Sequence, residues 1–416
     1  MKKTIKTWIN RSVKCFFIGA MVLSTFTIMA QQSLNFTEAN PHYRNALDLF
    51  EKEKYVPAQV YFEKTIQNIN DVHSEIRIEA EYYYAICSIE LFHANAEALL
   101  RKFVESHPES PHILSAYLNL AKFQFRKKKY EDVLDYLAKV DPLDLSAAER
   151  DEYYFKKGYS HFQLDEFDKA AKNFYEIKDT DNLYVSAARY YYAHISYKDG
   201  KYQTASENFR RIENDPKFGA IVPYYLTQIY YLQGKYEKLL NYAPAVLDSA
   251  PPKKEDEIRK LIGDAYYKTG EYEKALPHLE SYMKRNQVSP AEHYQLGYIY
   301  FHTKNYEQAV TSLQKSVSDN DTIAQSAYYL IGQSNFNTNN KKAARAALRN
   351  AWKLDIDKEI TEDALFNYAK LAYELSYHPY DDAIIAFEEY INNYPKSNKL
   401  NDAYEYLVGV YYTTKN

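Results

Sequence analysis

Few residues in this sequence have the types and spacing that catalysis needs. His107 and His112 lie five residues apart around Pro108 and Pro111, but zinc sites generally use three or more protein ligands. We therefore interpret the pair as ordinary surface histidines in a turn. A glycine-rich phosphate loop, a Gly-x-Ser-x-Gly turn and a His-Glu-x-x-His motif are all missing from the sequence. The sequence predicts a protein that is not an enzyme and that holds no metal or cofactor.

Residues 1–30 differ in composition from the rest of the chain. Five basic residues and no acidic residue precede an apolar run from Cys15 to Ala30. A basic head, a short apolar segment and a small residue before Gln31 are typical of a secretory signal peptide. The run is only slightly shorter than the ~20 residues that span a bilayer, so an uncleaved anchor is the alternative. We expect a signal peptide at 1–30, a linker at 31–40 and an exported mature chain.

The two cysteines give no sign of disulfide or lipid chemistry. Cys15 begins the apolar run, whereas a lipid-modified cysteine would be expected directly after it. Cleavage near Gln31 would leave Cys87 as the single cysteine of the mature chain, which excludes an internal disulfide. We interpret Cys87 as a buried apolar group, because a free cysteine is usually inert when it is buried.

The charge of the chain argues against nucleic acid and anionic lipid as the main partners. Removal of the five basic leader residues would leave 47 of the 52 basic residues against 56 acidic ones, a net charge of −9. Such partners require a basic stripe on the protein. The basic run at 126–129 is expected to end a helix, where cations interact favourably with the helix dipole. The pair at 253–254 is expected in a connection between repeats.

Aromatic residues recur at a spacing close to the length of a helical hairpin. The residue before the second helix of each proposed pair recurs every 34 to 39 residues, and the series is Tyr130, Phe167, Tyr202, Tyr236, Tyr272, Tyr306, Lys341 and Tyr380. A period near 34 residues indicates stacked helix-turn-helix repeats. The low content of 10 glycines favours helices joined by short turns. We therefore predict an all-α fold, built as one elongated solenoid.

Small and large residues repeat in step with this aromatic residue. The seventh and eighth residues of the first helices form large-small pairs in most repeats: Leu120-Ala121, Lys157-Gly158, Tyr192-Ala193, Leu226-Thr227, Ile262-Gly263, Leu296-Gly297, Ile331-Gly332 and Tyr368-Ala369. The small residue should let the partner helix approach closely. In most second helices a further small residue and, four residues later, a large apolar residue recur, as in Ala275 and Leu279. The segment 217–250 fits least well, with Leu239 at the small position.

These positions resemble the tetratricopeptide repeat (TPR) family. The resemblance is strongest from Gly263 to Ala275 and from Leu296 to Ala309, and tyrosines stand where the family often has tryptophan. It implies a right-handed superhelix of about ten repeats. The TPR array is expected to span 41–416. It comprises weaker repeats at 41–108, clear repeats at 114–395 and an incomplete last repeat at 397–416. Because a solenoid end usually carries a polar capping helix, we expect the array to continue or another molecule to cover this end.

The resemblance also implies where a partner would bind. In the TPR family, residues five, nine and twelve of each first helix line the concave groove. Carried over by position, the aromatic candidates for partner binding are Phe125, Phe155, Tyr159, Phe162, Tyr190, Tyr197, Tyr224, Tyr231, Tyr267, Tyr294, Tyr298, Phe301, Tyr329, Phe336, Phe366 and Tyr373. Polar residues between them are Lys122, Gln228, Asp264, Gln333 and Lys370. Position twelve is expected to be partly exposed, and the alternative for each ring is packing within or between repeats.

The resemblance implies binding and not catalysis. The endings FVESHP at 103–108 and YINNYP at 390–395 are similar to those of TPR proteins in bacterial envelope assembly. We expect an exported scaffold or adaptor, located in the periplasm or at the outer membrane of a Gram-negative bacterium, that binds protein or peptide segments and associates peripherally with an envelope membrane complex. The alternative is the ligand- or glycan-gathering part of a longer envelope enzyme or sensor, because aromatic rings also stack on sugars.

Overall fold

The computed structural model describes residues 41–249, 252–317, 322–375 and 381–414. Every regular element in these residues is helical, which confirms the all-α prediction. None of these helices is both long and apolar enough to cross a membrane. The chain divides into two compact units, Met1–Lys198 and Asp199–Asn416, called here the N-terminal and C-terminal units. The expected signal peptide and linker at 1–40 lie outside the described residues.

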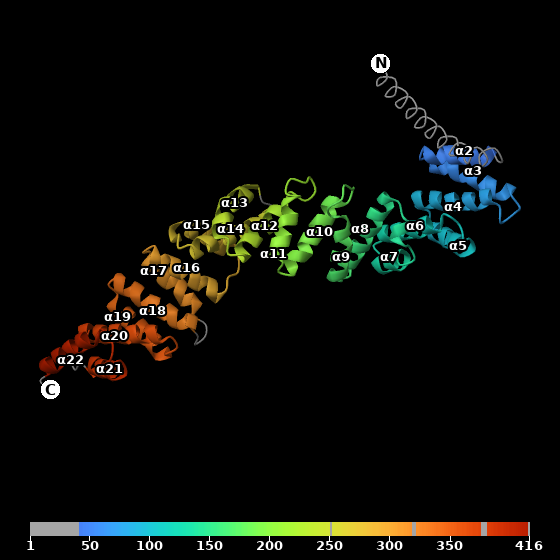
Figure 1. The fold of residues 1–416 in the computed structure, drawn as a ribbon. Helices are drawn as coiled ribbons and strands as arrows, with labels where there is room; N and C mark the ends of the chain where they lie inside the picture. The colour runs from blue at the N-terminus through green and yellow to red at the C-terminus, as the bar shows by residue number, and fades with distance from the viewer. Residues whose placement is uncertain (1–40, 250–251, 318–321, 376–380, 415–416) are drawn as a thin grey trace, which may run out of the picture. The chain divides into compact units, whose positions relative to one another are not determined.

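The helices follow one another in pairs joined by tight turns (Figure 1). The N-terminal unit contains α2 (Pro41–Glu51), α3 (Tyr55–Asn68), α4 (Glu75–Glu90), α5 (Ala96–Ser106), α6 (Ile113–Arg126), α7 (Tyr130–Leu137), the 3-10 turn η1 (Pro142–Asp144), α8 (Ala147–Gln163), α9 (Phe167–Ile177) and α10 (Val185–Lys198). The C-terminal unit contains α11 (Tyr202–Arg210), α12 (Val222–Leu232), α13 (Tyr236–Ser249), α14 (Pro252–Lys268), α15 (Tyr272–Arg285), α16 (Pro290–His302), α17 (Tyr306–Ser316), α18 (Thr322–Asn337), α19 (Lys341–Leu354), α20 (Lys358–Leu375), α21 (Asp381–Asn393) and α22 (Leu400–Thr414).

The turn between paired helices has the same construction in successive repeats. Seven second helices begin at the recurring residue itself, whereas the sequence predicts that each begins one position later: Tyr130, Phe167, Tyr202, Tyr236, Tyr272, Tyr306 and Lys341. Two residues earlier the backbone is left-handed in each, at Lys128, Asp165, Gly200, Gly234, Gly270, Lys304 and Asn339. A single residue in this conformation ends a helix and reverses the chain within a few residues. The eighth predicted residue of this series, Tyr380, lies outside the described residues.

The small residues of the first helices allow close helix packing, as the sequence predicts. A Cβ atom added at Gly297 would lie 2.5 Å from Leu313 Cγ, and one added at Gly332 would lie 2.7 Å from Leu348 Cγ. The same contact recurs at Gly263, where Leu279 Cγ would be 2.6 Å away. These distances are shorter than any van der Waals contact, so glycine sets the separation of the two helices at these repeats.

The interior positions of the second helices are also as predicted. The recurring small residues are completely buried at Ala170, Ala205, Ala275, Ala309, Ala344 and Ala383. The large residues four positions later are buried at Leu137, Phe174, Phe209, Leu279, Leu313, Leu348 and Phe387. Leu239 and Ala243 of the loosely matching repeat are completely buried as well. This repeat therefore keeps the same interior positions with different side-chain sizes.

First helices of neighbouring repeats contact each other as well as their own second helices. In the N-terminal unit α2 contacts α4, α4 contacts α6, and α6 contacts α8. In the C-terminal unit α12 contacts α14, α16 contacts α18, α18 contacts α20, and α20 contacts α22. Residues five, nine and twelve share one side of an α-helix. A side chain there can therefore meet a residue of the neighbouring repeat, and within each unit these positions form a surface that continues from repeat to repeat.

Candidate binding surface on the first helices

The first-helix face is defined here as positions five, nine and twelve of α6, α8 and α10 in the N-terminal unit and of α12, α14, α16, α18 and α20 in the C-terminal unit. Most of the predicted binding rings on it are half-buried: Phe125, Phe155, Tyr159, Phe162, Tyr190, Tyr197, Tyr231, Tyr267, Tyr294, Tyr298, Phe301, Tyr329 and Tyr373. Phe336 is 45% exposed. Every ring at position twelve thus keeps some exposed surface, as expected.

Two of the predicted binding residues are buried. Tyr224 and Phe366, both at position five, are each only 8% exposed. The Phe366 ring packs against Tyr390 with the ring centroids 5.3 Å apart. These two side chains present little surface to a partner, so their assignment as direct contact residues is corrected. Both also contact the next repeat, Phe366 through the Tyr406 ring at a centroid distance of 6.5 Å and Tyr224 through Glu257.

Position twelve forms a recurring ring pair with the aromatic residue that begins the second helix. The pairs and their centroid distances are Phe125–Tyr130 at 6.1 Å, Phe162–Phe167 at 5.6 Å, Tyr231–Tyr236 at 5.7 Å, Tyr267–Tyr272 at 6.1 Å and Phe301–Tyr306 at 5.9 Å. The rings meet at steep angles, the edge-to-face geometry that aromatic pairs favour. The turn aromatic therefore helps to fix the ring of position twelve, which keeps part of its surface exposed.

Rings at position nine connect one repeat with the preceding one. In the N-terminal unit, Tyr159 lies 5.3 Å from Phe125 and 5.9 Å from Tyr130 of the preceding repeat. In the C-terminal unit, Tyr298 lies 5.7 Å from Tyr267 and 5.8 Å from Tyr272. The same triangle of rings is thus built in both units. These aromatic residues pack between repeats and also contribute to the first-helix face, so the two interpretations open in the sequence both apply.

Several rings of this face were missed by sequence reasoning. Tyr191 lies 4.9 Å from Phe162 and 5.3 Å from Tyr159, and Tyr184 stacks on Phe155 at 4.6 Å. His302 lies 4.3 Å from Tyr298. Their positions in the first helices are not five, nine or twelve, and Tyr184 precedes α10. The run of tyrosines at 190–192 was the signal in the sequence, but only packing shows which ring faces the preceding repeat.

Two series of side-chain hydrogen bonds link position nine, position five and the next repeat. In the first, Gln228 Nε2 donates to Tyr224 Oη at 2.7 Å, and that hydroxyl donates to Glu257. In the second, Gln333 Nε2 lies 3.3 Å from Tyr329 Oη, which donates to Asp363 Oδ2 at 2.6 Å. The repetition of this arrangement shows that position five serves to join consecutive repeats.

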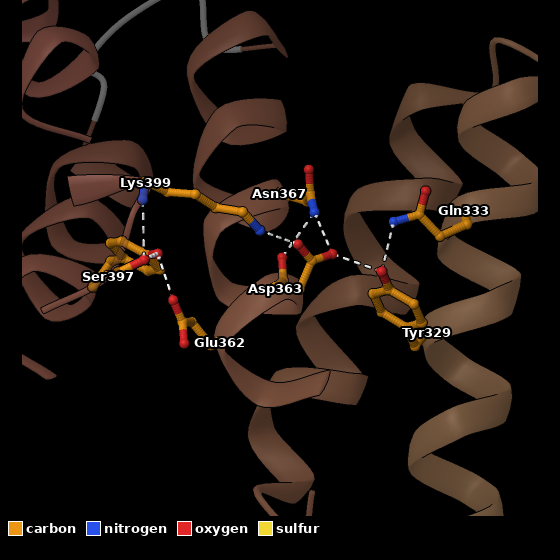
Figure 2. A network of polar contacts seen from close by, with 8 residues as sticks. Tyr329, Gln333, Glu362, Asp363, Asn367, Ser397 and Lys399 are labelled. Carbon is orange, nitrogen blue, oxygen red and sulfur yellow. Dashed lines mark hydrogen bonds and ion pairs between the residues drawn. The ribbon is translucent and has the colours of Figure 1, made fainter. Parts of the chain in front are cut away.

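Figure 2 shows the partners of the Asp363 carboxylate, which ends the second of these series of hydrogen bonds. Besides Tyr329, Asp363 accepts a hydrogen bond from Asn367 Nδ2 at 2.8 Å and pairs with Lys399 Nζ. The backbone N–H of Lys399 in turn donates to Ser397 Oγ at 3.1 Å. Three donors, on α18, on α20 and on the residue directly before α22, therefore converge on one carboxylate. Such a network fixes the spacing of three repeats and leaves little hydrogen-bonding capacity for a partner.

Burial and nearby charges keep the half-buried phenols of this face protonated. Burial raises the pKa of Tyr231, and the charge of Asp264 raises it further. The pKa of Tyr298 is raised to about 12, mainly by burial and then by a hydrogen bond with Tyr272. Protonated phenols can donate hydrogen bonds while their rings supply apolar contact area. The surface therefore combines rigid rings with polar donors.

The other residues with potential chemistry are occupied in structural contacts. His107 Nε2 lies 2.9 Å from Glu81, and His112 Nε2 lies 3.0 Å from Glu79. Among the residues that the structure describes, no group of three or more suitable side chains could hold a metal ion. Cys87 is buried, and burial raises the pKa of its thiol to about 12. This thiol is therefore kept in its unreactive protonated form.

Parts of the C-terminal unit match models of the tetratricopeptide repeat family. Models described as tetratricopeptide repeat match residues 325–355 and 363–397, and the model of anaphase-promoting complex, cyclosome, subunit 3 matches residues 237–316. These matches confirm the family expected from the sequence. Comparison with curated proteins gives no match.

Several solved structures are similar to this chain. YrrB, a TPR protein with an unusual peptide-binding site, is 18% identical, with 48% of this chain and 100% of that chain covered and a TM-score of 0.39. A TPR protein from Parabacteroides merdae is 15% identical, with 62% and 98% covered and a TM-score of 0.35. A chain of the Naa15/Naa10 complex with HypK-THB is 12% identical, with 90% and 61% covered and a TM-score of 0.43.

Proposed function

We propose that this protein is an exported, non-enzymatic adaptor that binds protein segments on its first-helix face and holds components of a cell-envelope assembly together. The TPR fold itself indicates a protein-protein interaction scaffold. Export to the periplasm or outer membrane of a Gram-negative bacterium is the finer part of the proposal. It is supported by the composition of residues 1–30 and by the envelope-like repeat endings at 103–108 and 390–395.

The observation that carries the binding proposal is the series of half-exposed rings at position twelve. Each of Tyr231, Tyr267 and Phe301 packs against a turn aromatic and keeps part of its surface exposed. Rigid aromatic side chains supply large contact areas at a low entropic cost, and they are enriched at protein interfaces. Because the rings recur from repeat to repeat, an extended segment or a helix could contact several of them in succession.

Photo-crosslinking in the native envelope tests this proposal. A crosslinking amino acid at Tyr231 or Phe301 should capture the same protein reproducibly, whereas matched positions on the second helices, Lys238 and Gln314, should not. Mass spectrometry then identifies the captured molecule. Glycan adducts would favour the alternative of a glycan-gathering protein. Capture of protein only from Lys238 and Gln314 would place recognition on the other side of the repeats and contradict the proposal.

A triple variant provides a second test. Changing Tyr231, Tyr267 and Phe301 to Ala should abolish capture or weaken binding at least about tenfold, because buried aromatic residues dominate interface energies. Circular dichroism would verify that the helices remain. Retention of every interaction by a folded triple variant would show that the first-helix face is not the binding surface.

Export is tested by the N-terminus of the mature protein. We expect amino-terminal sequencing of the protein from fractionated cells to begin near Gln31, because the small Ala30 ends the apolar run. Retention of Met1 in a membrane fraction would instead indicate an uncleaved anchor, and recovery of the full chain from the cytoplasm would contradict export.

A further inference from the structure

Asp264 differs from the other carboxylates on and beside the first-helix face. It stands at position nine of α14 and is only 8% exposed. Gln295 Nε2 donates to its Oδ1 at 2.8 Å. Among the side chains that the structure describes, no cationic group lies within 4.0 Å of this carboxylate. A largely buried carboxylate without an ion pair is energetically costly.

Three other carboxylates of the first helices have cationic partners. Glu152 lies 2.7 Å from Lys122, Asp363 pairs with Lys399, and Glu292 lies 2.6 Å from Lys260. Lys260 is one turn before Asp264 on α14, but its ammonium group is bound to Glu292. In agreement with this arrangement, burial raises the pKa of Asp264, and the hydrogen bond from Gln295 and the charge of Lys260 only partly oppose that effect.

Half-buried aromatic rings lie on the helix of Asp264 and on the first helices before and after it. Tyr267 is three residues later on the same side of α14, and Tyr231 lies on α12, which contacts α14. The Tyr298 ring of α16 lies 5.7 Å from the Tyr267 ring. The charge of Asp264 also contributes to the raised pKa of Tyr231 and Tyr267, after burial in each case. Both rings therefore lie within electrostatic range of the carboxylate.

We propose that Asp264, Tyr231 and Tyr267 form a subsite for one basic side chain, arginine or lysine, of the protein segment that binds the first-helix face. This inference rests on the proposed function and specifies the chemistry of the partner. The cation would pair with the carboxylate and lie against the aromatic rings, whose faces attract positive charge. An arginine would suit the site well, because its flat guanidinium group both stacks on rings and binds carboxylates.

A peptide selection on the intact protein tests the subsite. Random twelve-residue peptides displayed on phage would be selected on the wild-type chain, and peptides whose binding is lost in Phe301→Ala would be kept as ligands of the first-helix face. We expect these peptides to share one basic residue. Its replacement by citrulline or glutamine should weaken binding to the wild-type chain at least about tenfold, as for other charge pairs removed from interfaces.

Protein variants then locate the basic residue. Asp264→Asn should weaken binding of the peptide with the basic residue at least about tenfold. If the basic residue and Asp264 contact each other, the neutral peptide should bind the wild-type and Asp264→Asn chains with affinities within about twofold of each other. Asparagine keeps the oxygen that accepts from Gln295, so this variant should fold. Glu273→Gln removes the same charge from an exposed site of α15 in the same repeat and serves as the control.

The outcomes separate the subsite from the proposed function. If no selected peptide depends on Phe301, both the binding surface and the subsite are wrong. The peptides that need Phe301 for binding could lack a shared basic residue, or Asp264→Asn and Glu273→Gln could weaken their binding equally. Either result would support the first-helix face as the binding surface and contradict the subsite. Citrulline substitution on the wild-type chain gives an answer even if Asp264→Asn does not fold.

Discussion

Positions five and twelve of the first helices differ although both carry aromatic residues. Phe366 at position five of α20 is 8% exposed, whereas Phe336 at position twelve of the preceding first helix, α18, is 45% exposed. Tyr329 at position five donates its hydroxyl to the next repeat, while Tyr231 at position twelve packs on the turn aromatic of its own repeat. One surface of a repeat protein therefore contains a row of residues that joins repeats and a second row that can meet a partner.

The difference follows from the direction in which each position points. Position five lies toward the beginning of the next first helix, where Glu257 and Asp363 accept hydrogen bonds. Position twelve lies near the tight turn, where the next repeat does not cover it completely. We expect substitutions at position five to affect mainly stability, and substitutions at position twelve to affect mainly binding.

The matched substitutions Phe366→Ala and Phe336→Ala should give the largest contrast. Removing a buried phenylalanine leaves a cavity, so Phe366→Ala should lower the free energy of unfolding by about 3–4 kcal/mol. Phe336→Ala should lower it by less than about 1 kcal/mol. Urea unfolding followed by circular dichroism measures both, with separate transitions fitted if the two units unfold independently. Similar losses for the two variants would remove the distinction between the two positions.

Hydroxyl removal should show the same contrast on a smaller scale. Tyr329→Phe removes one of the donors to Asp363, and we expect a loss of about 1–2 kcal/mol. Tyr231→Phe keeps the ring pair with Tyr236 and should change stability by less than about 0.5 kcal/mol. Thermal unfolding of both variants checks this expectation. A larger effect at Tyr231 would mean that its hydroxyl also joins repeats.

The contribution of Asp264, at position nine, to the free energy of unfolding should depend on pH. The raised pKa of Asp264 means that its ionised form destabilises the fold above that pKa, an effect that disappears as the pH falls below the unfolded value. Glu292, whose pKa is lowered because hydrogen bonds from Lys260 and Ser289 outweigh the effect of burial, stabilises the fold until the pH falls through its folded pKa.

Isosteric amide variants separate these two effects. At pH 7, Asp264→Asn should raise and Glu292→Gln should lower the free energy of unfolding, each by about 1 kcal/mol. Both differences should shrink as the pH approaches 3 in urea titrations. A loss of stability in Asp264→Asn at neutral pH would mean that its carboxylate already has a stabilising partner.

The turn beneath position twelve should give the smallest effect. Lys304 adopts φ 62° and Gly270 φ 78° at equivalent places. Since only glycine adopts this conformation without strain, Lys304→Gly should stabilise the chain by about 0.5 kcal/mol and Gly270→Ala should destabilise it by about 1 kcal/mol. Differential scanning calorimetry measures both shifts. If Lys304→Gly destabilised the chain and Gly270→Ala stabilised it, the two turns would not share a common structure.

Much of the fold could be predicted from local patterns in the sequence. The start of α15 at Tyr272 and the close contact of Gly297 with Leu313 both follow from residues that recur at the repeat spacing. The exposure of position twelve was also predicted correctly. The burial of Phe366 and the ring contacts of Tyr191 were not predicted, because each depends on how the surrounding helices pack against that side chain.

The sequence by itself determined the helical repeats, their turns and their interior residues, because these depend on side-chain size and on hydrogen bonds within about 35 residues. Only the tertiary structure decided which residues of the first-helix face join repeats and which stay open. Gln333, Tyr329 and Asp363 form one chain through contacts between helices, and Asp264 lacks an ion pair because Lys260 reaches Glu292 instead. Such choices depend on the spacing of neighbouring helices, which residue identity alone does not specify.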